Sequence, residues 1–274
     1  MLVALVLLAA VLHASWNALG KASSDKLVGM AAITVSGGCA IATLIPFLPP
    51  LPAAAWPYVG GSVVLHFAYQ LTLITAYRHG DLSHVYPIAR GVAPLGVALV
   101  GALVLGEAPG GWQLAGLVAA SAAIGSLAFG GSDAVPGRAV LYALLTGFWI
   151  SVYTVVDGAG ARIAENALSF AAWALALDAV PIGLFAFVRR RGRLIAALLK
   201  EGPRYVAGGV ISVIGYGIVL WAFTREALWG VAALRETSVV FAALIGSRLL
   251  REPFGRRRTV AAVALALGLV ALRV

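Results

Sequence analysis

Charged residues and cysteine are both scarce in this sequence. Only 11% of its 274 residues are charged, whereas soluble domains average about 25%. The single cysteine, Cys39, excludes a disulfide framework and a thiolate metal site. A hydrophobic content of 61% excludes both a soluble globular domain and a disordered chain. These values favour a chain that is embedded in a lipid bilayer.

The sequence also lacks the motifs of well-known catalytic and cofactor sites. It has no H-E-x-x-H, G-x-S-x-G, Walker or C-x-x-C motif. We therefore expect no enzyme activity, no metal, no cofactor and no ATP-driven transport. The net charge of +9 would suit nucleic acid, but basic loops on the cytoplasmic side of a membrane explain it better. We expect no nucleic-acid partner.

A membrane helix needs about 20 mostly apolar residues, and ten stretches of the sequence meet this requirement. They are residues 2–20, 27–48, 58–77, 82–105, 112–129, 139–156, 167–188, 205–223, 227–249 and 259–273. We therefore predict an all-α membrane protein with ten transmembrane helices and no soluble domain. The connection from Arg189 to Arg204 is predicted to hold a short interfacial helix at residues 194–199. The first stretch lacks the features of a cleaved signal peptide, and we expect it to be a membrane helix.

Basic residues are distributed unevenly between the connections, and this predicts the orientation. Odd-numbered connections carry fourteen, namely Lys21, Lys26, Arg78, Arg138, Arg189, Arg190, Arg191, Arg193, Lys200, Arg204, Arg251, Arg256, Arg257 and Arg258. Even-numbered connections and the two ends carry three, namely Arg162, Arg225 and Arg273. We therefore expect the odd connections to be cytoplasmic and both termini to lie outside. The location expected for such a chain is a bacterial-type inner membrane.

The two halves of the chain resemble each other. Arg90 precedes Glu107 by 17 residues, and Arg235 precedes Glu252 by the same number. We interpret residues 1–131 and 132–274 as two repeats of five helices each. Because five is odd, the second repeat would be inverted in the membrane, as in many secondary transporters. Chance similarity between two strings rich in Ala, Gly and Leu is the alternative.

Several segments together resemble a known family. They are His13-Ala-Ser-Trp-Asn17, Tyr86-Pro-Ile-Ala-Arg-Gly-Val-Ala-Pro94, Gly106-Glu107 and Arg235-Glu-Thr-Ser-Val-Val-Phe-Ala-Ala. In these segments the chain resembles the drug/metabolite transporter superfamily, EamA type. The resemblance implies ten helices in two inverted repeats around a central cavity, and export of amino acids, other metabolites or drugs. Many relatives are thought to keep both termini in the cytoplasm, whereas the charge distribution here predicts the opposite.

Two arginines lie near the middle of predicted membrane spans. Arg90 is about 13 Å into its span at about 1.5 Å per residue, and Arg235 is at a similar depth in another. A guanidinium suits a carboxylate or a phosphate, so both arginines are predicted to bind substrate. The alternative is an internal salt bridge, with Glu236 and Asp178 as charge partners. If Glu236 faces the cavity, it could bind an ammonium group or carry a coupling proton.

Aromatic and polar residues within the spans complete the predicted binding site. They are His13, Trp16, Asn17, Tyr69, Tyr86, Tyr153, Tyr216 and Trp221. Aromatic rings beside an arginine suit a small zwitterion, although Trp and Tyr also collect at membrane interfaces. His66 is interpreted as a hydrogen-bonded core residue.

The sequence as a whole favours a secondary transporter that works by alternating access. The predicted substrate is a small amino acid-like or other polar metabolite, zwitterionic or anionic, with export and proton coupling expected. A phosphorylated or phosphonate anion and a lipid headgroup are the alternatives. A cationic drug fits less well, because it would want an exposed acid without competing arginines. The protein is expected to be a monomer or a homodimer.

Overall fold

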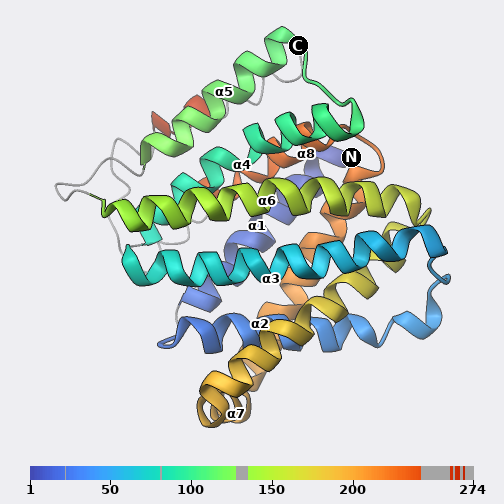
Figure 1. The fold of residues 1–274 in the computed structure, drawn as a ribbon, viewed down its shortest axis with the longest axis vertical. Helices are drawn as coiled ribbons and strands as arrows, with labels where there is room; N and C mark the ends of the chain where they lie inside the picture. The colour runs from blue at the N-terminus through green and yellow to red at the C-terminus, as the bar shows by residue number, and fades with distance from the viewer. Residues whose placement is uncertain are drawn as a thin grey trace. The chain divides into compact units, whose positions relative to one another are not determined.

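A computed structural model of the chain describes residues 1–21, 23–80, 82–127, 135–241, 260, 261, 263–265 and 268. The described residues form helices and no strands (Figure 1). The helices are α1 (Leu2–Lys21), α2 (Lys26–Ala42), η1 (Ile45–Phe47), η2 (Ala53–Ala55), α3 (Trp56–His79), α4 (Leu82–Leu105), α5 (Gly111–Ser126), α6 (Gly137–Ile163), α7 (Ala167–Phe223) and α8 (Leu228–Arg235).

Six helices in the described part of the chain are long and apolar enough to cross a membrane. Large apolar side chains on their surfaces are exposed, as Leu103, Val188 and Val64 illustrate, and such side chains suit contact with lipid. The predicted all-helical membrane class is therefore supported. The predicted count of ten spans stays a prediction, because residues 242–259 lie outside the described residues.

The chain divides into two compact units, and each unit takes residues from both halves of the sequence. Unit 1 contains residues 1–67 and 156–225, and unit 2 contains residues 68–155 and 226–274. The predicted repeats at 1–131 and 132–274 are a different kind of division, by sequence similarity rather than by packing, and they stay a prediction.

Helix α7 is 57 residues long, and two breaks divide it into a hairpin within unit 1 (Figure 1). The backbone leaves helical geometry at Arg190 and again at Glu201. Pro203 explains the second break, since its ring clashes with the preceding turn and it has no N–H to donate. The first limb (residues 167–189) and the second limb (residues 202–223) correspond to the predicted spans 167–188 and 205–223. The short helix between the breaks lies where the sequence predicted one.

Both limbs of α7 pack against α2, and glycines permit the closest approach. A Cβ atom at Gly37 would lie 2.8 Å from the backbone oxygen of Gly209. A Cβ atom at Gly209 would lie 2.7 Å from the backbone oxygen of Ile33. Small residues are common where membrane helices approach closely, and here they let α2 contact the second limb directly.

The connections of unit 1 meet in two sets. Asp25, in the first connection, contacts Arg190 and Arg193 in the seventh. Ser169, in the first turn of α7 just after the sixth connection, donates its hydroxyl to the carbonyl oxygen of Pro49 in the second connection, at 2.9 Å. The first set joins two odd-numbered connections, and the second set lies at two even-numbered ones. Helices that cross a membrane in alternating directions would place their connections in this way.

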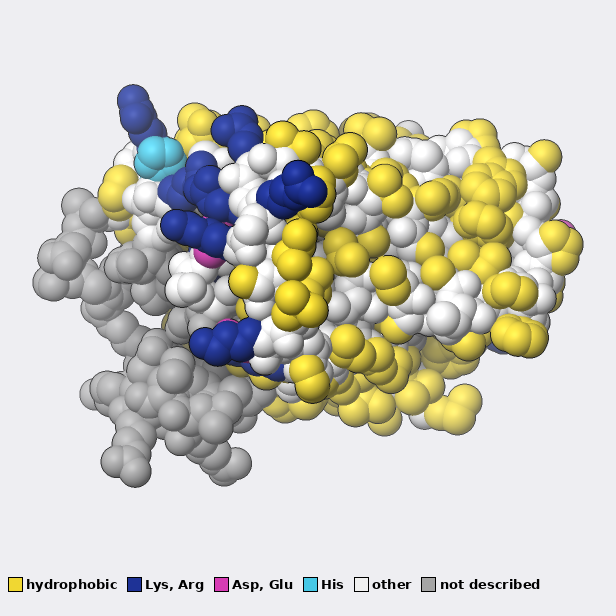
Figure 2. Space-filling model, turned by 90° about the horizontal axis from the view of Figure 1, so that it is seen from below, with side chains coloured by type: hydrophobic (Ala, Val, Ile, Leu, Met, Phe, Trp, Pro, Cys, Tyr) yellow, Lys and Arg dark blue, Asp and Glu magenta, His cyan; other side chains and the backbone are white. Residues whose placement is uncertain are grey.

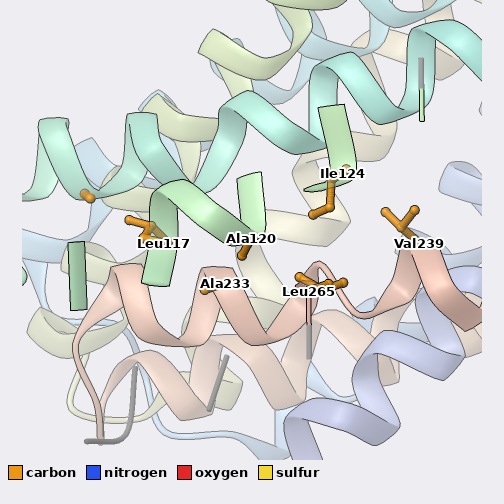
Figure 3. Close-up of a cluster of buried hydrophobic side chains, with 7 residues drawn as sticks. Leu117, Ala120, Ile124, Ala233, Val239 and Leu265 are labelled. Atoms are coloured by element: carbon orange, nitrogen blue, oxygen red, sulfur yellow. The ribbon is translucent and has the colours of Figure 1, made fainter. Parts of the chain in front are cut away.

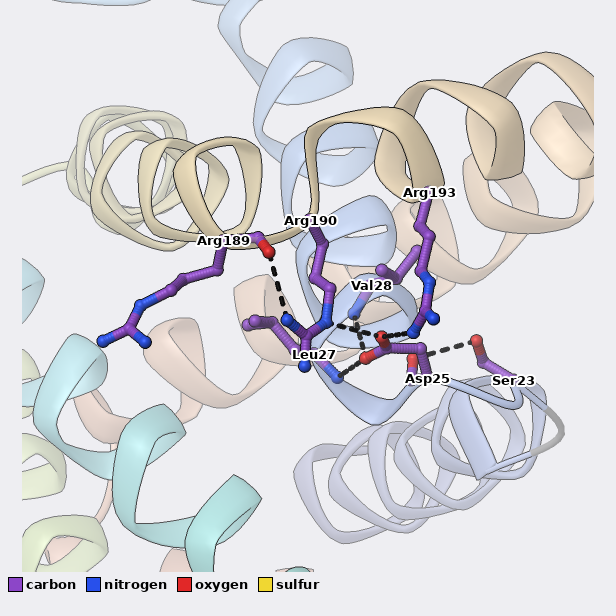
Figure 4. Close-up of polar contacts among 7 residues, drawn as sticks. All are labelled: Ser23, Asp25, Leu27, Val28, Arg189, Arg190 and Arg193. Carbon is purple, nitrogen blue, oxygen red and sulfur yellow. Dashed lines mark hydrogen bonds and ion pairs between the residues drawn. The ribbon is translucent and has the colours of Figure 1, made fainter.

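The first break of α7 is tied to the start of α2 through Asp25 (Figure 4). Asp25 Oδ2 accepts from Arg190 Nε at 3.1 Å and from Arg193 Nη1 at 3.3 Å. Asp25 Oδ1 accepts from the backbone N–H groups of Leu27 and Val28, which makes Asp25 the N-cap of α2. Burial opposes the charge, but the hydrogen bonds from Val28, the two arginines and Leu27 outweigh it and lower the pKa of Asp25 below 3.8.

An apolar cluster in unit 2 holds α8 against α5 (Figure 3). Leu117, Ala120 and Ile124 of α5 face Ala233 of α8 and Leu265. Burying such side chains contributes about 1.5–3 kcal/mol for each large one. This packing fixes the C-terminal end of α8, where Arg235 lies.

A second contact fixes the N-terminal end of α8. Gly106 follows α4 with a φ of +70°, a conformation that glycine adopts without strain. The chain then turns so that Glu107 Oε2 accepts the backbone N–H of Leu228, the first residue of α8, at 3.1 Å. A carboxylate is favourable at this position because the N-terminus of a helix carries partial positive charge.

We expect Gly209→Ala to lower the free energy of unfolding by about 1–3 kcal/mol, because the added methyl group overpacks the contact with α2. Gly217→Ala is the matched control on the same limb, since a Cβ atom there meets no atom within 4 Å. That control is expected to be neutral or more stable by up to about 1 kcal/mol, because alanine favours the helix. Thermal unfolding in detergent measures both, and equal effects at the two positions would contradict the close approach.

Asp25 gives the stability of the protein a pH dependence whose sign follows from its lowered pKa. Ionised Asp25 stabilises the fold above the unfolded-state pKa, and this contribution is lost as the pH falls through the lower folded-state pKa. We expect the wild-type protein to be more stable than Asp25→Asn at neutral pH, and the difference to shrink below about pH 4.

The size of that difference is limited by solvent. The side chains of Arg190 and Arg193 are 39% and 72% exposed, so the ion pairs are worth less than about 1 kcal/mol. Asparagine keeps the N-cap, whereas Asp25→Ala removes it and should cost about 1 kcal/mol more. Thermal unfolding across a pH series tests this, and a wild-type advantage that persists unchanged in acid would refute it.

Candidate functional site

The best-defined charged cluster of unit 2 is centred on Arg90. Its Nε atom lies 2.9 Å from Glu236 Oε2, and its Nη2 atom donates to the hydroxyl of Ser238 at 3.1 Å. Arg90 and Glu236 are each 3% exposed. The two side chains come from helices that lie 146 residues apart in the sequence. A buried ion pair of this kind is costly to break, because either partner alone would be an uncompensated charge.

The helical backbone tightens where Glu236 lies. The sequence predicted one span over residues 227–249, but α8 ends at Arg235. The N–H groups of Glu236, Thr237, Val239 and Val240 donate to carbonyl oxygens three residues earlier rather than four. The hydroxyl of Thr237 also donates to the carbonyl oxygen of Leu234 at 2.7 Å. Such 3₁₀ geometry within a helix often marks a functional element.

The helix that carries Arg90 is also weakened, by two prolines. Pro87 and Pro94 both lie inside α4. Because Pro94 has no N–H, the carbonyl oxygen of Arg90 receives no helical hydrogen bond from it. Both partners of the Arg90–Glu236 pair are therefore held by backbone that departs from ideal helical hydrogen bonding.

Three tyrosines and a second arginine surround this pair. The ring of Tyr86 lies 5.8 Å from the guanidinium carbon of Arg90, and the rings of Tyr69 and Tyr153 are 5.6 Å apart, edge to face. Arg235 is buried and acts electrostatically on both Glu236 and Tyr69, as Arg90 does. The structure thus brings six of the predicted site residues into one unit.

A second polar cluster lies in unit 1, around Asp157. Asp157 is fully buried in α6, and the hydroxyl of Tyr216 donates to its Oδ2 atom. The Nε2 atom of His66 lies 3.9 Å from the same oxygen. His66 Nδ1 lies 3.0 Å from the carbonyl oxygen of Ser62. His66 therefore has the hydrogen-bonded environment expected for it, and it also lies beside an acid, Asp157.

Sequence reasoning missed Asp157. The predicted span ended at residue 156, whereas α6 continues to Ile163. Asp157 therefore fell at the edge of the prediction, where a charged residue needs no explanation. The apolar and small residues on both sides of Asp157 do indicate that the helix continues beyond residue 156.

The other predicted residues lie in unit 1. The rings of His13 and Trp16 in α1 are 5.2 Å apart, edge to face, and the amide of Asn17 donates to the backbone oxygen of His13. The ring of Trp221 in α7 lies 5.8 Å from the guanidinium of Arg225. Asp178 is buried in the first limb of α7. The predicted site residues are thus divided between two clusters of different chemistry.

Comparison with known proteins identifies the class of the chain. The EamA-like transporter family matches residues 137–274. The uncharacterized protein PA1977 of Pseudomonas aeruginosa is 30% identical over 262 residues, which cover 92% of this chain and 85% of that protein. A protein of known crystal structure is similar in fold, with a TM-score of 0.74 over 98% of this chain and 94% of its own, at 17% identity.

Apolar helices that suit a bilayer and these similarities together define a multi-pass integral membrane protein that acts as a transporter. The chain belongs to the EamA-like transporter family, within the drug/metabolite transporter superfamily. The resemblance seen in the sequence is therefore confirmed. Members of this family are transporters rather than enzymes.

Proposed function

We propose that this protein is a secondary transporter that exports a small amino acid-like or other polar metabolite by alternating access between its repeats. The observation that carries the proposal is the buried Arg90–Glu236 pair beside Arg235. Ionisable groups inside a membrane protein are costly and usually functional. No motif for ATP hydrolysis occurs in the sequence, which favours transport driven by a gradient.

Arg90 has donor capacity that suits a substrate carboxylate. A guanidinium has five N–H donors, and Arg90 directs Nε at Glu236 and Nη2 at Ser238. These two contacts involve two of the five N–H groups. A carboxylate would bind such a guanidinium through two parallel hydrogen bonds.

Glu236 and the tyrosines would bind the ammonium group of a zwitterion. In the structure Glu236 is the charge partner of Arg90. When a substrate carboxylate takes over Arg90, Glu236 can pair with the substrate ammonium, while the rings of Tyr69, Tyr86 and Tyr153 provide cation–π contacts. A zwitterion leaves the net charge of the buried site unchanged, whereas a phosphate would add negative charge. This favours an amino acid-like substrate over a phosphorylated one.

The remaining predicted residues stay proposals for the lining of the transport pathway. These are His13, Trp16, Asn17, Tyr216 and Trp221, with Asp178 as a proposed charge partner. Their support is that the aromatic side chains are partly buried rather than fully packed, which suits a surface that a solute can reach.

We expect amino acids to raise the unfolding temperature of the detergent-solubilised wild-type protein, but not that of Arg90→Ala or Arg235→Ala. A ligand that binds only the folded state at about 100 times its Kd contributes about 2.7 kcal/mol. The thermal-shift panel holds amino acids, phosphorylated metabolites and organic cations. Stabilisation by phosphorylated compounds alone would replace the proposed substrate class.

A charge-balanced variant separates binding from folding. Arg90→Gln alone leaves Glu236 buried without its partner, which should cost about 3–5 kcal/mol. The double variant Arg90→Gln, Glu236→Gln removes both charges and should recover most of that stability without recovering the response to amino acids. A double variant that amino acids stabilise as much as the wild type would show that the pair is structural.

The orientation is also part of the proposal. We propose a bacterial inner-membrane location, cytoplasmic odd connections and external termini, in a monomer or homodimer. Figure 2 shows several Lys and Arg side chains on the viewed face, together with many hydrophobic side chains. The run Arg189, Arg190, Arg191 and Arg193 at the first break of α7 fits the cytoplasmic bias of basic residues.

Cysteine labelling tests this orientation. In a Cys39→Ser background, Gly192→Cys probes an odd connection and Gly111→Cys an even one, and a side chain at either position meets no atom within 4 Å. A membrane-impermeant maleimide should label Gly111→Cys in intact cells, but Gly192→Cys only after lysis. The reverse pattern would place both termini in the cytoplasm.

A further inference from the structure

The acid of unit 1, Asp157, has partners that can exchange a proton. It lies in α6, fully buried, and faces His66 of α3 and Tyr216 of α7. Three helices thus converge on one carboxylate. The proposed substrate site in unit 2 makes no use of this cluster.

The hydrogen bonds around His66 determine which ring nitrogen faces the acid. His66 Nδ1 lies 3.0 Å from the carbonyl oxygen and 3.3 Å from the hydroxyl of Ser62. Because a carbonyl oxygen can only accept, the shorter contact favours a proton on Nδ1. The Nε2 atom therefore carries a lone pair when the ring is neutral, and it points at Asp157 Oδ2 from 3.9 Å. The rings of His66 and Tyr216 meet edge to face at 5.7 Å, which fixes both side chains beside the acid.

Three other titratable groups lie on segments close to Asp157 or to its partners. Tyr58 of α3 lies against Gly160, one turn along α6. His13 of α1 has its backbone N 4.0 Å from a Cβ atom built at Gly215, next to Tyr216. Arg162, five residues beyond Asp157, directs Nε at the carbonyl oxygen of Phe223 at 2.7 Å.

Unit 1 also holds Asp178 of α7 and the charged and titratable groups of α2. Asp178 is buried on the first limb of α7. On α2, Lys26 donates to the carbonyl oxygen of Ser23, and Cys39 is exposed. His66 and Tyr216 thus both lie against the Asp157 carboxylate.

We propose that Asp157, with His66 and Tyr216, forms a proton-binding site that couples transport to proton movement. This inference rests on the proposed secondary transport. One proton binds Oδ2 of the ionised Asp157 and converts the carboxylate to a carboxylic acid. His66 Nε2 passes the proton on by accepting it from solvent and giving it to Oδ2, and Tyr216 keeps its hydroxyl proton throughout.

This cluster suits coupling better than the Arg90–Glu236 pair does. Glu236 lies against the guanidinium of Arg90, a permanent cation that opposes protonation of the carboxylate as long as the pair is intact. Asp157 faces the imidazole of His66 and the hydroxyl of Tyr216, and neither group is a permanent cation. A conformation that admits water to Asp157 favours the ionised acid, and a closed conformation favours the protonated acid, so protonation shifts the balance between them.

Infrared difference spectroscopy of the lipid-reconstituted protein tests the site without a substrate. As the pH is lowered, we expect the C=O stretching band of a protonated carboxylic acid to appear in the wild type. We expect Asp157→Asn to lose this band and Asp157→Glu to shift it. Asp178→Asn is the matched control, a buried aspartate of the same unit, and should retain the band.

Each outcome supports or overturns the proposal. A wild type without a titrating carboxyl band overturns it, as does a band that survives in Asp157→Asn. Should Asp157→Asn fail to fold, Tyr216→Phe and His66→Gln take its place, and both should shift the pH at which the band appears. A band that is indifferent to both changes would assign it to another acid.

The test also separates this proposal from the proposed function. If amino acids do not stabilise the protein but the Asp157 band titrates, the substrate assignment fails and the proton site stands. If amino acids stabilise the protein and Asp157 does not titrate, the substrate site stands and the coupling site fails.

Discussion

The constraint on which the rest of the structure depends is that charge cannot stay uncompensated inside an apolar molecule. Arg90 and Glu236 satisfy it by contact with each other, and Asp157 satisfies it by accepting from Tyr216 beside His66. Breaking one partner of a buried pair costs several kcal/mol, which is a large part of the stability of a typical domain. The helices that carry these residues are therefore held in place by the charges as well as by apolar packing.

Backbone irregularities occur where those charges must meet. The helix that carries Glu236 tightens to 3₁₀ bonds at that residue, and prolines flank Arg90 on α4. Close packing elsewhere compensates for these weak points. Gly37 and Gly209 bring α2 against the second limb of α7, and Leu117 and its neighbours hold α8 in place. Regular helices and tight contacts thus position a few irregular segments that carry the chemistry.

The sequence predicted the features that depend on local composition and missed those that depend on distant pairing. Apolar runs and the arginines at the first break of α7 were sufficient to locate both limbs and the short helix between them. The two mid-span arginines were also recognised from the sequence. Whether Arg90 contacts Glu236 or a substrate depends, however, on the packing of two segments whose residues are 146 positions apart. Asp157 was missed because a span boundary placed one turn too early makes a buried acid look like a loop residue. The role of Glu107, which caps α8, is likewise set by a residue 121 positions away.

Asp157 and Glu236 share an arrangement that the composition of the two units explains. Each unit combines residues from both halves of the chain, so a base from the first half can meet an acid from the second. His66 meets Asp157 in unit 1, and Arg90 meets Glu236 in unit 2. The partners differ in one respect that decides their chemistry: an arginine stays charged at any physiological pH, whereas a histidine does not. An acid beside arginine is suited to exchange one charged partner for another, and an acid beside histidine is suited to gain and lose a proton. The same pairing of halves can therefore supply a recognition site and a coupling site within one chain.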